Sequence, residues 1–365
     1  MMKKILYAAY TLDVGGIETA LVNMLNELVK KYDVTLVLEK KQGIFLDDLN
    51  RKIKVIEYNP NLSKNAIIRK TINFIKRIKF ILKFYNKFDF AASFVTYSKM
   101  GSFCARTASR NNALWCHAKY STIFNSKNEM KEFFEFISYN KFKKIVFVSN
   151  EGAEDFIKIF PKAKEKIMVC NNLIDSKKIV ELSKEKIELE KIDFPTFLNV
   201  GRHEEKQKKI SRIIEASKIL ANEGYKFRIL MIGDGPDSSK YKEMVKDNNL
   251  EDYILFLGKK KNPYPYFKIS DSMILTSDYE GYPVVYIEAM ILGIPILTTN
   301  VSDSKRDIDG KYGIVVNNNT IEEIATQMKE IIVNKEKYKK EFDTELFNNK
   351  IINKIENLIN GGNNA

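Results

Sequence analysis

A strand–loop–helix–strand unit over residues 272–299 constrains the fold of this chain more than any other stretch. Its two ends, residues 272–276 and 294–299, are short apolar runs that contain β-branched side chains, as is typical of buried strands. A short helix lies between them, and Pro283 is near its first turn, where the missing N–H costs no hydrogen bond. Two sheet strands joined through a helix run parallel, so the unit predicts an α/β protein with a parallel sheet.

Two carboxylates lie in this otherwise apolar unit, Glu280 on the loop and Glu288 within the helix. Taken singly, each fits a solvated surface charge. Together they have a second interpretation, because the loop that follows a parallel strand lies at the carboxyl edge of the sheet, where open α/β folds bind ligands. Carboxylates accept hydrogen bonds from hydroxyl groups, so a pair that faces one ligand suits a ribose or another sugar ring.

Residues 280–295 follow the pattern E-G-x-P-x4-E-A-x3-G-x-P. This pattern resembles the E-x7-E element of the retaining GT4-type glycosyltransferases with the GT-B fold. The resemblance implies an α/β chain of two Rossmann-like, doubly wound parallel-sheet domains that face a central cleft. It also implies that Glu288 binds the ribose of a UDP- or GDP-linked sugar donor and that Glu280 has a catalytic role, binding hydroxyls of the donor sugar. By the same resemblance, no cofactor and no metal are expected.

The resemblance extends to a strand over residues 196–202, which ends on Arg202, and to the basic loop after it. Arg202 and Lys208 are predicted to bind the donor diphosphate and to stabilise it catalytically as it leaves, because an arginine fork and a lysine ammonium both suit phosphate oxygens. Lys208 is preferred to Lys206, since the apolar register that begins at Ile210 fits that choice. The stretch then resembles the family's G-R-x4-K-G pattern with one extra residue after Arg202 and with Lys209 in place of the last glycine. A solvated basic loop is the alternative for the lysines.

Two further positions at strand ends are predicted to line the nucleotide site. Gly233 lies in a G-x-G-P turn after the strand over residues 227–233, where a glycine either contacts the nucleotide or only shapes a tight turn. Lys259 opens the loop after the strand over residues 253–258. The resemblance places the nucleotide base at that loop.

The first half of the chain contributes two candidates. Gly15 and Gly16 join the strand over residues 3–10 to a helix, so either the turn requires them or a ligand phosphate approaches the helix N-terminus there. Their G-G-x-E pattern resembles the opening of the same glycosyltransferases, which implies Gly16 as a backbone contact to the donor diphosphate. His117 ends the strand over residues 114–117. It is either structural or, by the resemblance, a catalytic-site residue against the transferred sugar.

At 365 residues the chain is long enough for two domains. The predicted domains are residues 1–175, which bind the acceptor, and residues 176–345, which bind the nucleotide sugar; a helix and a frayed tail follow at residues 346–365. The boundary rests on a stretch that resembles the family's V-x-x-N-G-[IV]-D linker entry, with Leu173 in place of the glycine. The three cysteines are odd in number and lack C-x-x-C spacing, which predicts buried thiols in a reducing compartment.

The net charge of +13 is unevenly distributed. Residues 1–180 carry 32 basic and 17 acidic residues, a net charge of +15, whereas residues 181–365 carry 28 and 30, a net charge of −2. A basic surface attracts nucleic acid or an anionic membrane, and no nucleic-acid-binding module is recognisable, so nucleic acid is not an expected partner. Residues 63–88 predict one long helix with an apolar face and no acidic residue. That helix either closes a domain core or lies on anionic lipid headgroups.

Residues 1–13 do not resemble a signal peptide, and no run approaches 18 apolar residues, so the expected location is the cytoplasm, at the inner face of the membrane. The predicted activity is retaining transfer of a hexosyl or related group to a lipid-linked or glycan acceptor, in the synthesis of capsule or another surface polysaccharide. The alternatives are a non-catalytic sugar-nucleotide-binding subunit and a GT-B epimerase. Asp307 and Asp309 spell a D-x-D metal motif, but a pair of loop carboxylates is the preferred interpretation.

Overall fold

The computed structural model of the chain describes residues 2–13 and 15–362, which form two compact units. Met1–Ile174 and Glu345–Ala365 make up the first unit, and Asp175–Thr344 make up the second. The C-terminal helix, which the sequence set apart as a separate segment, therefore groups with the first unit. Residues 363–365 of the expected tail lie outside the described residues. The acceptor-binding and donor-binding roles of the two domains stay predictions.

The first unit is built on a seven-stranded sheet in the order β3-β2-β1-β4-β5-β6-β7, and every neighbouring pair of strands is parallel. Its strands are β1 (Lys4–Ala9), β2 (Asp33–Leu38), β3 (Lys54–Glu57), β4 (Phe90–Ser93), β5 (Asn112–Cys116), β6 (Lys144–Phe147) and β7 (Ile167–Val169). Strands β4, β5 and β6 are buried along their whole length. This burial follows from their apolar composition, because a parallel sheet is covered by helices on both faces.

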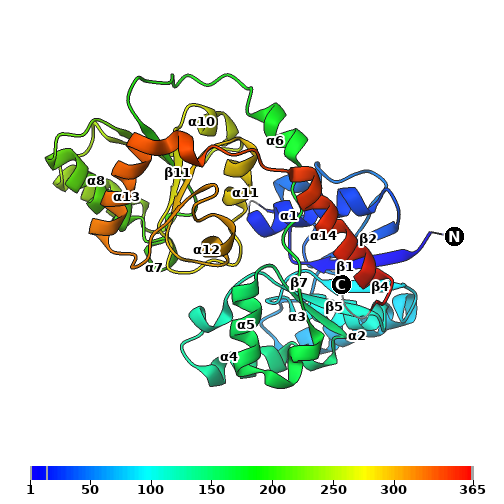
Figure 1. The fold of residues 1–365 in the computed structure, drawn as a ribbon. Coiled ribbons are helices and arrows are strands. Elements are labelled where there is room, and N and C mark those ends of the chain that lie inside the picture. Colours follow the sequence, from blue (N-terminus) through cyan, green and yellow to red (C-terminus); the bar gives the residue numbers. More distant parts are fainter. Residues whose placement is uncertain (1, 14, 363–365) are drawn as a thin grey trace. The chain divides into compact units, whose positions relative to one another are not determined.

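The helices of the first unit alternate with its strands, as Figure 1 shows. They are α1 (Gly16–Leu28), α2 (Ala66–Phe84), α3 (Lys99–Ala108), α4 (Lys127–Phe136), α5 (Asn150–Ile159) and α14 (Thr344–Ile359). Ser98, Ser126 and Ser149 cap α3, α4 and α5, because each side-chain oxygen accepts a hydrogen bond from an N–H of the first turn. Asn65 caps α2 in the same way, accepting from two N–H groups.

Helix α14, red in Figure 1, is tied to the first unit by polar contacts as well as by its apolar face. The Nδ2 atom of Asn111 donates to the carbonyl oxygens of Leu358 and Ile359 at 3.1 and 3.0 Å. Lys354 Nζ donates to the carbonyl oxygen of Val169 at 2.9 Å. The last helix of the chain therefore packs beside strands that precede it by nearly two hundred residues.

Helix α2 differs from the other long helices because its apolar side chains are largely exposed. Phe80 is its one buried residue. Exposed apolar side chains recur along and just beyond the helix, at Ile67, Ile68, Phe74, Ile75, Ile78, Leu82 and Tyr85. Their exposed fractions range from 40% for Ile78 to 77% for Ile67, so the predicted apolar face does not close the core of this unit.

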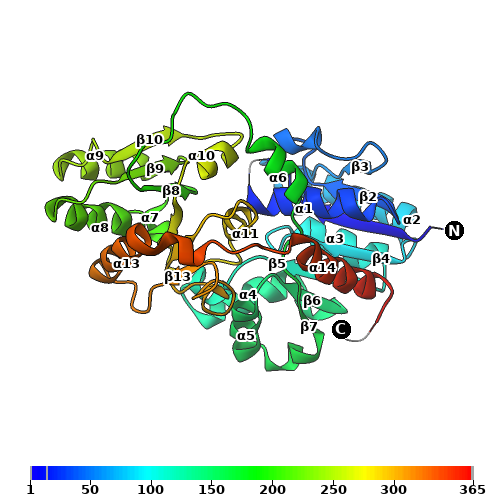
Figure 2. The same ribbon diagram turned by 45° about the horizontal axis from the view of Figure 1, so that its top comes forward.

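The second unit holds a six-stranded sheet in the order β10-β9-β8-β11-β12-β13, again parallel throughout. Its strands are β8 (Thr196–Val200), β9 (Arg228–Ile232), β10 (Ile254–Gly258), β11 (Ser272–Leu275), β12 (Ile296–Thr298) and β13 (Gly313–Val315). Its helices are α6 (Ser176–Leu182), α7 (Glu205–Lys208), α8 (Ser211–Asn222), α9 (Ser238–Asp247), α10 (Tyr264–Lys268), α11 (Val284–Ile291), α12 (Ser304–Asp307) and α13 (Ile321–Asn334). Helices α8, α9 and α13 share one apolar core with the strands (Figure 2).

Both units thus have the doubly wound α/β architecture that the sequence predicts, and the fold class is confirmed. In the described residues no helix is long and apolar enough to cross a membrane. Cys104, Cys116 and Cys170 are buried and free of disulfides, as their spacing predicts.

Candidate functional site

The strand order of the second unit reverses between β8 and β11. Starting from β8, the chain adds β9 and β10 on one side, and then returns to place β11, β12 and β13 on the other. At such a reversal the loops after the two central strands diverge and leave a crevice at the carboxyl edge of the sheet, which is the usual ligand site of this architecture. The loop after β8 carries Arg202 and Lys208, and the loop after β11 carries Glu280.

Lys208 and Glu280 meet at this edge. Lys208 Nζ lies 2.6 Å from Glu280 Oε1, and the two side chains are only 18% and 9% exposed. Ser277 Oγ donates to the same carboxylate oxygen at 2.7 Å. Gln207 Nε2 lies 3.4 Å from the other oxygen, Glu280 Oε2. The carboxylate is thus held in place by neutral and cationic donors from both loops, while Lys206 remains exposed.

Hydrogen bonds to backbone carbonyl groups also connect the two loops. Asp278 N donates to the Gln207 carbonyl at 2.9 Å, and Thr276 Oγ1 donates to the Lys209 carbonyl at 2.9 Å. Lys209 itself has a left-handed backbone, with φ 48° and ψ 44°, at the position where the resemblance calls for glycine. The left-handed turn ends α7 and directs the chain into α8, so this loop keeps its shape although the glycine is replaced.

Glu288 is buried within α11. Burial raises the pKa of its carboxyl to about 7, and a hydrogen bond from the Tyr264 hydroxyl at 3.0 Å opposes that rise. Tyr264 opens α10, and both α10 and α11 pack against α6. The same carboxylate and burial raise the pKa of Tyr264, so the phenol remains a donor at neutral pH. Glu288 is therefore a buried carboxyl with one phenol donor, poised between its charged and neutral forms.

Arg202 and Lys259 lie at the carboxyl ends of β8 and β10 and are largely exposed. Arg202 Nη1 is 3.5 Å from Glu204 Oε2, and Lys259 Nζ is 3.9 Å from Asp234 Oδ2. Their side chains are 67% and 76% exposed, so both contacts are weak surface pairs. Unlike Lys208, these cations can reorient towards an incoming anion without leaving a buried charge behind.

Gly233 has a demanding structural role, whatever its contact with a ligand. Its φ is +142°, and a Cβ atom there would lie 1.8 Å from the carbonyl oxygen of Gly201. A Cβ at Gly235 would lie 2.3 Å from the carbonyl oxygen of His203. The turn after β9 thus presses its backbone against the turn after β8, which supports the interpretation of Gly233 as a shaping residue.

In the first unit, Gly16 opens α1 after Gly15, which serves as the N-cap without a side chain. The Glu18 carboxylate lies against Gly15, and burial raises the pKa of Glu18. His117 Nε2 donates to the Phe94 carbonyl at 2.9 Å, and burial lowers the pKa of His117 to about 4. A neutral imidazole that donates through Nε2 accepts through Nδ1, and among the described residues that buried Nδ1 has no partner. It can therefore accept a hydrogen bond from a ligand hydroxyl.

The D-x-D carboxylates have structural partners. Asp307 accepts a hydrogen bond from Tyr282 at 3.1 Å and pairs with Arg306. Asp309 accepts from the Val315 N–H at 3.0 Å and pairs with Lys305 at 2.8 Å. Among residues 2–13 and 15–362 no cluster of side chains has the composition of a metal site.

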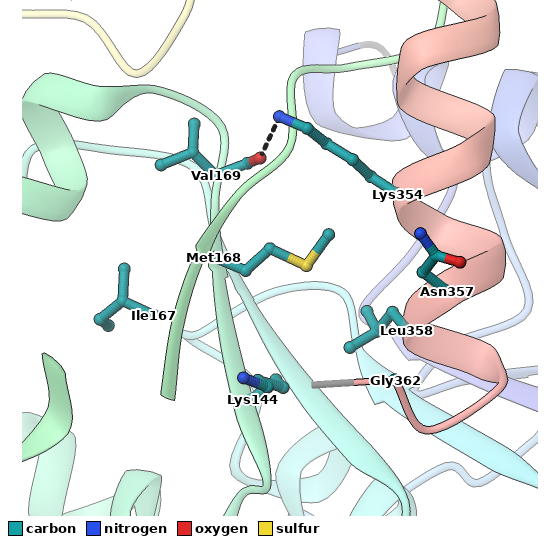
Figure 3. A pocket seen from close by; sticks show the side chains of 8 residues that line it. All are labelled: Lys144, Ile167, Met168, Val169, Lys354, Asn357, Leu358 and Gly362. Carbon is teal, nitrogen blue, oxygen red and sulfur yellow. Dashed lines mark hydrogen bonds between the residues drawn. The ribbon is translucent and has the colours of Figure 1, made fainter. Parts of the chain in front are cut away.

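A separate cavity of about 240 Å³ lies in the first unit beside α14 (Figure 3). It is lined by Lys144 and Ile167, the first residues of β6 and β7, and by Lys354 from α14. The lining also includes Met168 and Val169, so the cavity runs along the whole of the edge strand β7, between that strand and α14. None of the predicted site residues lines it, so we do not count it in the candidate site.

Sequence reasoning missed three contributors: Tyr264, Ser277 and Gln207. Gln207 adjoins Lys208, and Ser277 lies three residues before Glu280, so nearness to a predicted residue was the available signal. Tyr264 gave no such signal, because its partner lies 24 residues away on another helix.

Comparisons with known proteins agree with this architecture. The family model described as Glycosyltransferase Family 4 matches residues 14–178, and that of Glycosyl transferases group 1 matches residues 181–343. An N-acetylgalactosamine-N,N'-diacetylbacillosaminyl-diphospho-undecaprenol 4-alpha-N-acetylgalactosaminyltransferase of Campylobacter jejuni is 25% identical over 328 residues, 86% of each chain. An uncharacterized glycosyltransferase of Methanocaldococcus jannaschii is 28% identical over 198 residues, so the match spans only 48% of that relative and of this chain.

Among solved structures, the Anabaena protein HepE in complex with UDP and glucose superposes with a TM-score of 0.76 at 17% identity, over 97% of this chain and 99% of that one. Two doubly wound units matched in this way define the GT-B fold. With both family models matched in succession, the chain belongs to the GT4-type glycosyltransferases, the group 1 family.

The tight turn after β9 makes a first testable prediction. Gly233→Ala should lower the free energy of unfolding by about 3 kcal/mol or more, since the new methyl group overlaps a backbone oxygen. Gly224→Ala is the matched control, because Gly224 also has a positive φ, +80°, but no atom lies within 4 Å of its Cβ position. The control should lose about 1 kcal/mol. Urea denaturation measures both, and equal losses would contradict the close approach.

Glu288 makes a second prediction, on the pH dependence of stability. Its pKa is raised to about 7 in the folded state, so the unfolded chain ionises this group at lower pH than the folded protein does. The folded state therefore loses stability as pH rises from about 4.5 through 7, by roughly 3 kcal/mol in total. Glu288→Gln should remove this loss, so its melting temperature should approach or exceed the wild-type value at pH 8 while giving no gain at pH 5. A variant that is equally destabilised at both pH values would refute the buried-acid account.

Proposed function

We propose that this protein is a retaining, metal-independent glycosyltransferase that moves a sugar from a UDP- or GDP-linked donor to a lipid-linked or glycan acceptor. The observation that carries the proposal is the largely buried Lys208–Glu280 pair at the strand reversal of the second unit. A cation for a diphosphate and a carboxylate for sugar hydroxyls are brought together there, at the edge where this architecture binds ligands.

The chemistry follows from the charges. As the bond between the sugar's anomeric carbon and the phosphate oxygen breaks, negative charge grows on the leaving diphosphate. Lys208 and Arg202 stabilise that charge, and they do so most in the transition state. The acceptor oxygen forms the new bond on the same face of the sugar, and its proton passes to the leaving phosphate. Glu280 orients the donor sugar, and Glu288 accepts from the ribose hydroxyls.

Printed names of relatives support the substrate classes. The Campylobacter relative acts on a sugar-diphospho-undecaprenol acceptor, and a Staphylococcus aureus relative is a poly(ribitol-phosphate) alpha-N-acetylglucosaminyltransferase. HepE was solved with UDP and glucose. We therefore propose a role in the assembly of a surface polysaccharide, with a lipid-linked acceptor as the leading substrate class. Gly16 and His117 keep their predicted roles towards the diphosphate and the transferred sugar.

Arg202 and Lys208, which we call the donor clamp, are tested by alanine substitution. Arg202→Ala and Lys208→Ala should each lower kcat by about a hundredfold or more, because each removes a charge-assisted contact to the leaving group. Lys206→Ala is the matched control from the same loop, and its exposed side chain should be nearly dispensable. Product formation from a panel of UDP- and GDP-sugars is the measurement. If no sugar nucleotide binds or turns over, the proposed activity is wrong; binding without turnover would favour the non-catalytic subunit.

We also propose that the first unit associates with anionic membrane through α2. The apolar side chains of this helix are exposed, and residues 63–88 carry eight basic residues and no acidic one. The apolar face would be buried between the lipid headgroups, and each nearby basic residue would contribute about 1 kcal/mol of attraction to anionic lipid. Together these contributions would give reversible binding.

Flotation with vesicles tests this association. Binding should require anionic lipid and weaken at high salt, because the attraction of surface charges is screened. Lys70→Glu with Lys83→Glu should abolish flotation, whereas Lys242→Glu with Lys246→Glu, on exposed positions of the second unit, should leave it unchanged. Binding that ignores lipid charge, or that both double variants weaken equally, would rule out α2 as the electrostatic anchor.

A further inference from the structure

Three cations of the first unit, Arg77 on α2 and Lys99 and Arg106 on α3, lie near one another. In the described residues the Glu39 carboxylate, which accepts from Ser98 next to Lys99, pairs with none of them. Lys99, Phe103 and Arg106 follow the i, i+4, i+7 spacing of one face of α3. The Arg77 guanidinium, from α2, lies over the Phe103 ring at 5.6 Å from its centroid. Helices α2 and α3 are held together there by the rings of Phe80 and Phe103, whose centroids are 5.8 Å apart. Arg77 therefore lies over the middle of this face of α3, between Lys99 and Arg106.

Each of these cations is held by groups that leave its charge uncancelled. Lys99 Nζ lies 3.5 Å from the centroid of the Phe136 ring, and Arg106 Nε donates to the Ser102 carbonyl at 3.1 Å. Arg77 has the Phe103 ring and the Tyr58 hydroxyl. Within residues 2–13 and 15–362, none of the three forms an ion pair with a carboxylate.

The charges of Arg77 and the α3 pair repel one another. Burial, and next the charge of Arg77, lower the pKa of both Lys99 and Arg106. Like charges that repel one another cost free energy in the unliganded protein. An anion that bound among them would relieve the repulsion, and a planar arginine fork can contact two phosphate oxygens at once.

We propose that Arg77, Lys99 and Arg106 form a binding site for a diphosphate group, made entirely by the first unit and therefore additional to the donor clamp of the second. The inference rests on the proposed function, in which the acceptor is carried on a lipid diphosphate. A diphosphate diester carries two negative charges on adjacent phosphates, which suits three cations spread over two helices better than a singly charged headgroup does. Phe74 and Ile78 lie close to Arg77 in the sequence of α2, and Phe136 of α4 lies against Lys99. These exposed apolar side chains would face the lipid part.

Vesicle binding without donor tests the site. The probe is a vesicle of neutral phosphatidylcholine that contains a polyprenyl diphosphate. The comparison vesicle has the same surface charge, but phosphatidylglycerol supplies it. The wild-type protein should bind the diphosphate vesicles more tightly, and free pyrophosphate should displace it. Arg77→Gln, Lys99→Gln and Arg106→Gln should each weaken this binding about tenfold, as expected for the loss of one charge-assisted contact.

Lys79→Gln is the matched control, because Lys79 is an exposed cation of α2 outside the cluster. It should change the affinity less than about twofold, the effect of one charge in the general field. Competition by pyrophosphate should persist in Lys208→Ala, which separates this site from the donor clamp. Equal losses in the cluster variants and in Lys79→Gln, or equal binding to both charged vesicles, would overturn the site. A failure to find any sugar-nucleotide donor would instead overturn the proposed function, and the two results are distinguishable because no donor is present in this assay.

Discussion

The reversal of strand order between β8 and β11 is the constraint from which the candidate site follows. Parallel strands deliver all their following loops to one edge, and the reversal separates the loops after the two central strands. The ends of the sheet partly shield the polar side chains on those loops from water. These side chains must therefore find their hydrogen-bond partners on the neighbouring loop. Lys208 and Glu280 are brought together under these conditions, each only partly accessible to water. Removing either partner would leave a largely buried charge, so the pair fixes the shape of both loops.

This pairing would also permit the exchange of partners that the proposed function requires. If Lys208 turned towards a phosphate, Glu280 would keep the neutral donor Ser277, so the carboxylate would not lose all of its hydrogen bonds. Glu288 is arranged differently: its partner is the Tyr264 phenol, and burial holds its pKa near neutrality. Hydroxyl groups of a ligand can then replace weak or shared contacts in both places. A site built of such contacts needs little rearrangement when a ligand binds, which lowers the cost of ordering it.

The sequence predicted the sheets because the apolar runs at the strands are too short for helices and contain β-branched residues, and their order in the chain is the order of a doubly wound fold. The sequence also favoured Lys208 over Lys206 for the diphosphate; the structure places Lys208 against Glu280 and leaves Lys206 exposed, while the diphosphate role stays a prediction. The periodicity that made this possible, from Ile210 onward, is local. The contact of Tyr264 with Glu288 and the clash that reserves Gly233 for glycine depend on how two loops approach in space, which no local pattern encodes. Helix α14 could likewise not be assigned to the first unit, because an apolar face indicates burial but not the partner.

The same limit explains why two accounts of α2 remained open from its sequence. A period of 3.6 residues predicts an apolar face but does not say whether protein covers it, and the structure leaves most of that face exposed. Two features raise the free energy of the isolated unit: apolar side chains are in contact with water, and unpaired cations repel one another. An anionic, partly apolar surface relieves both costs at once, whereas a small soluble anion relieves only the second. The two units therefore place their cations under opposite conditions: the second shields a paired lysine at the sheet edge, while the first exposes unpaired ones beside hydrocarbon.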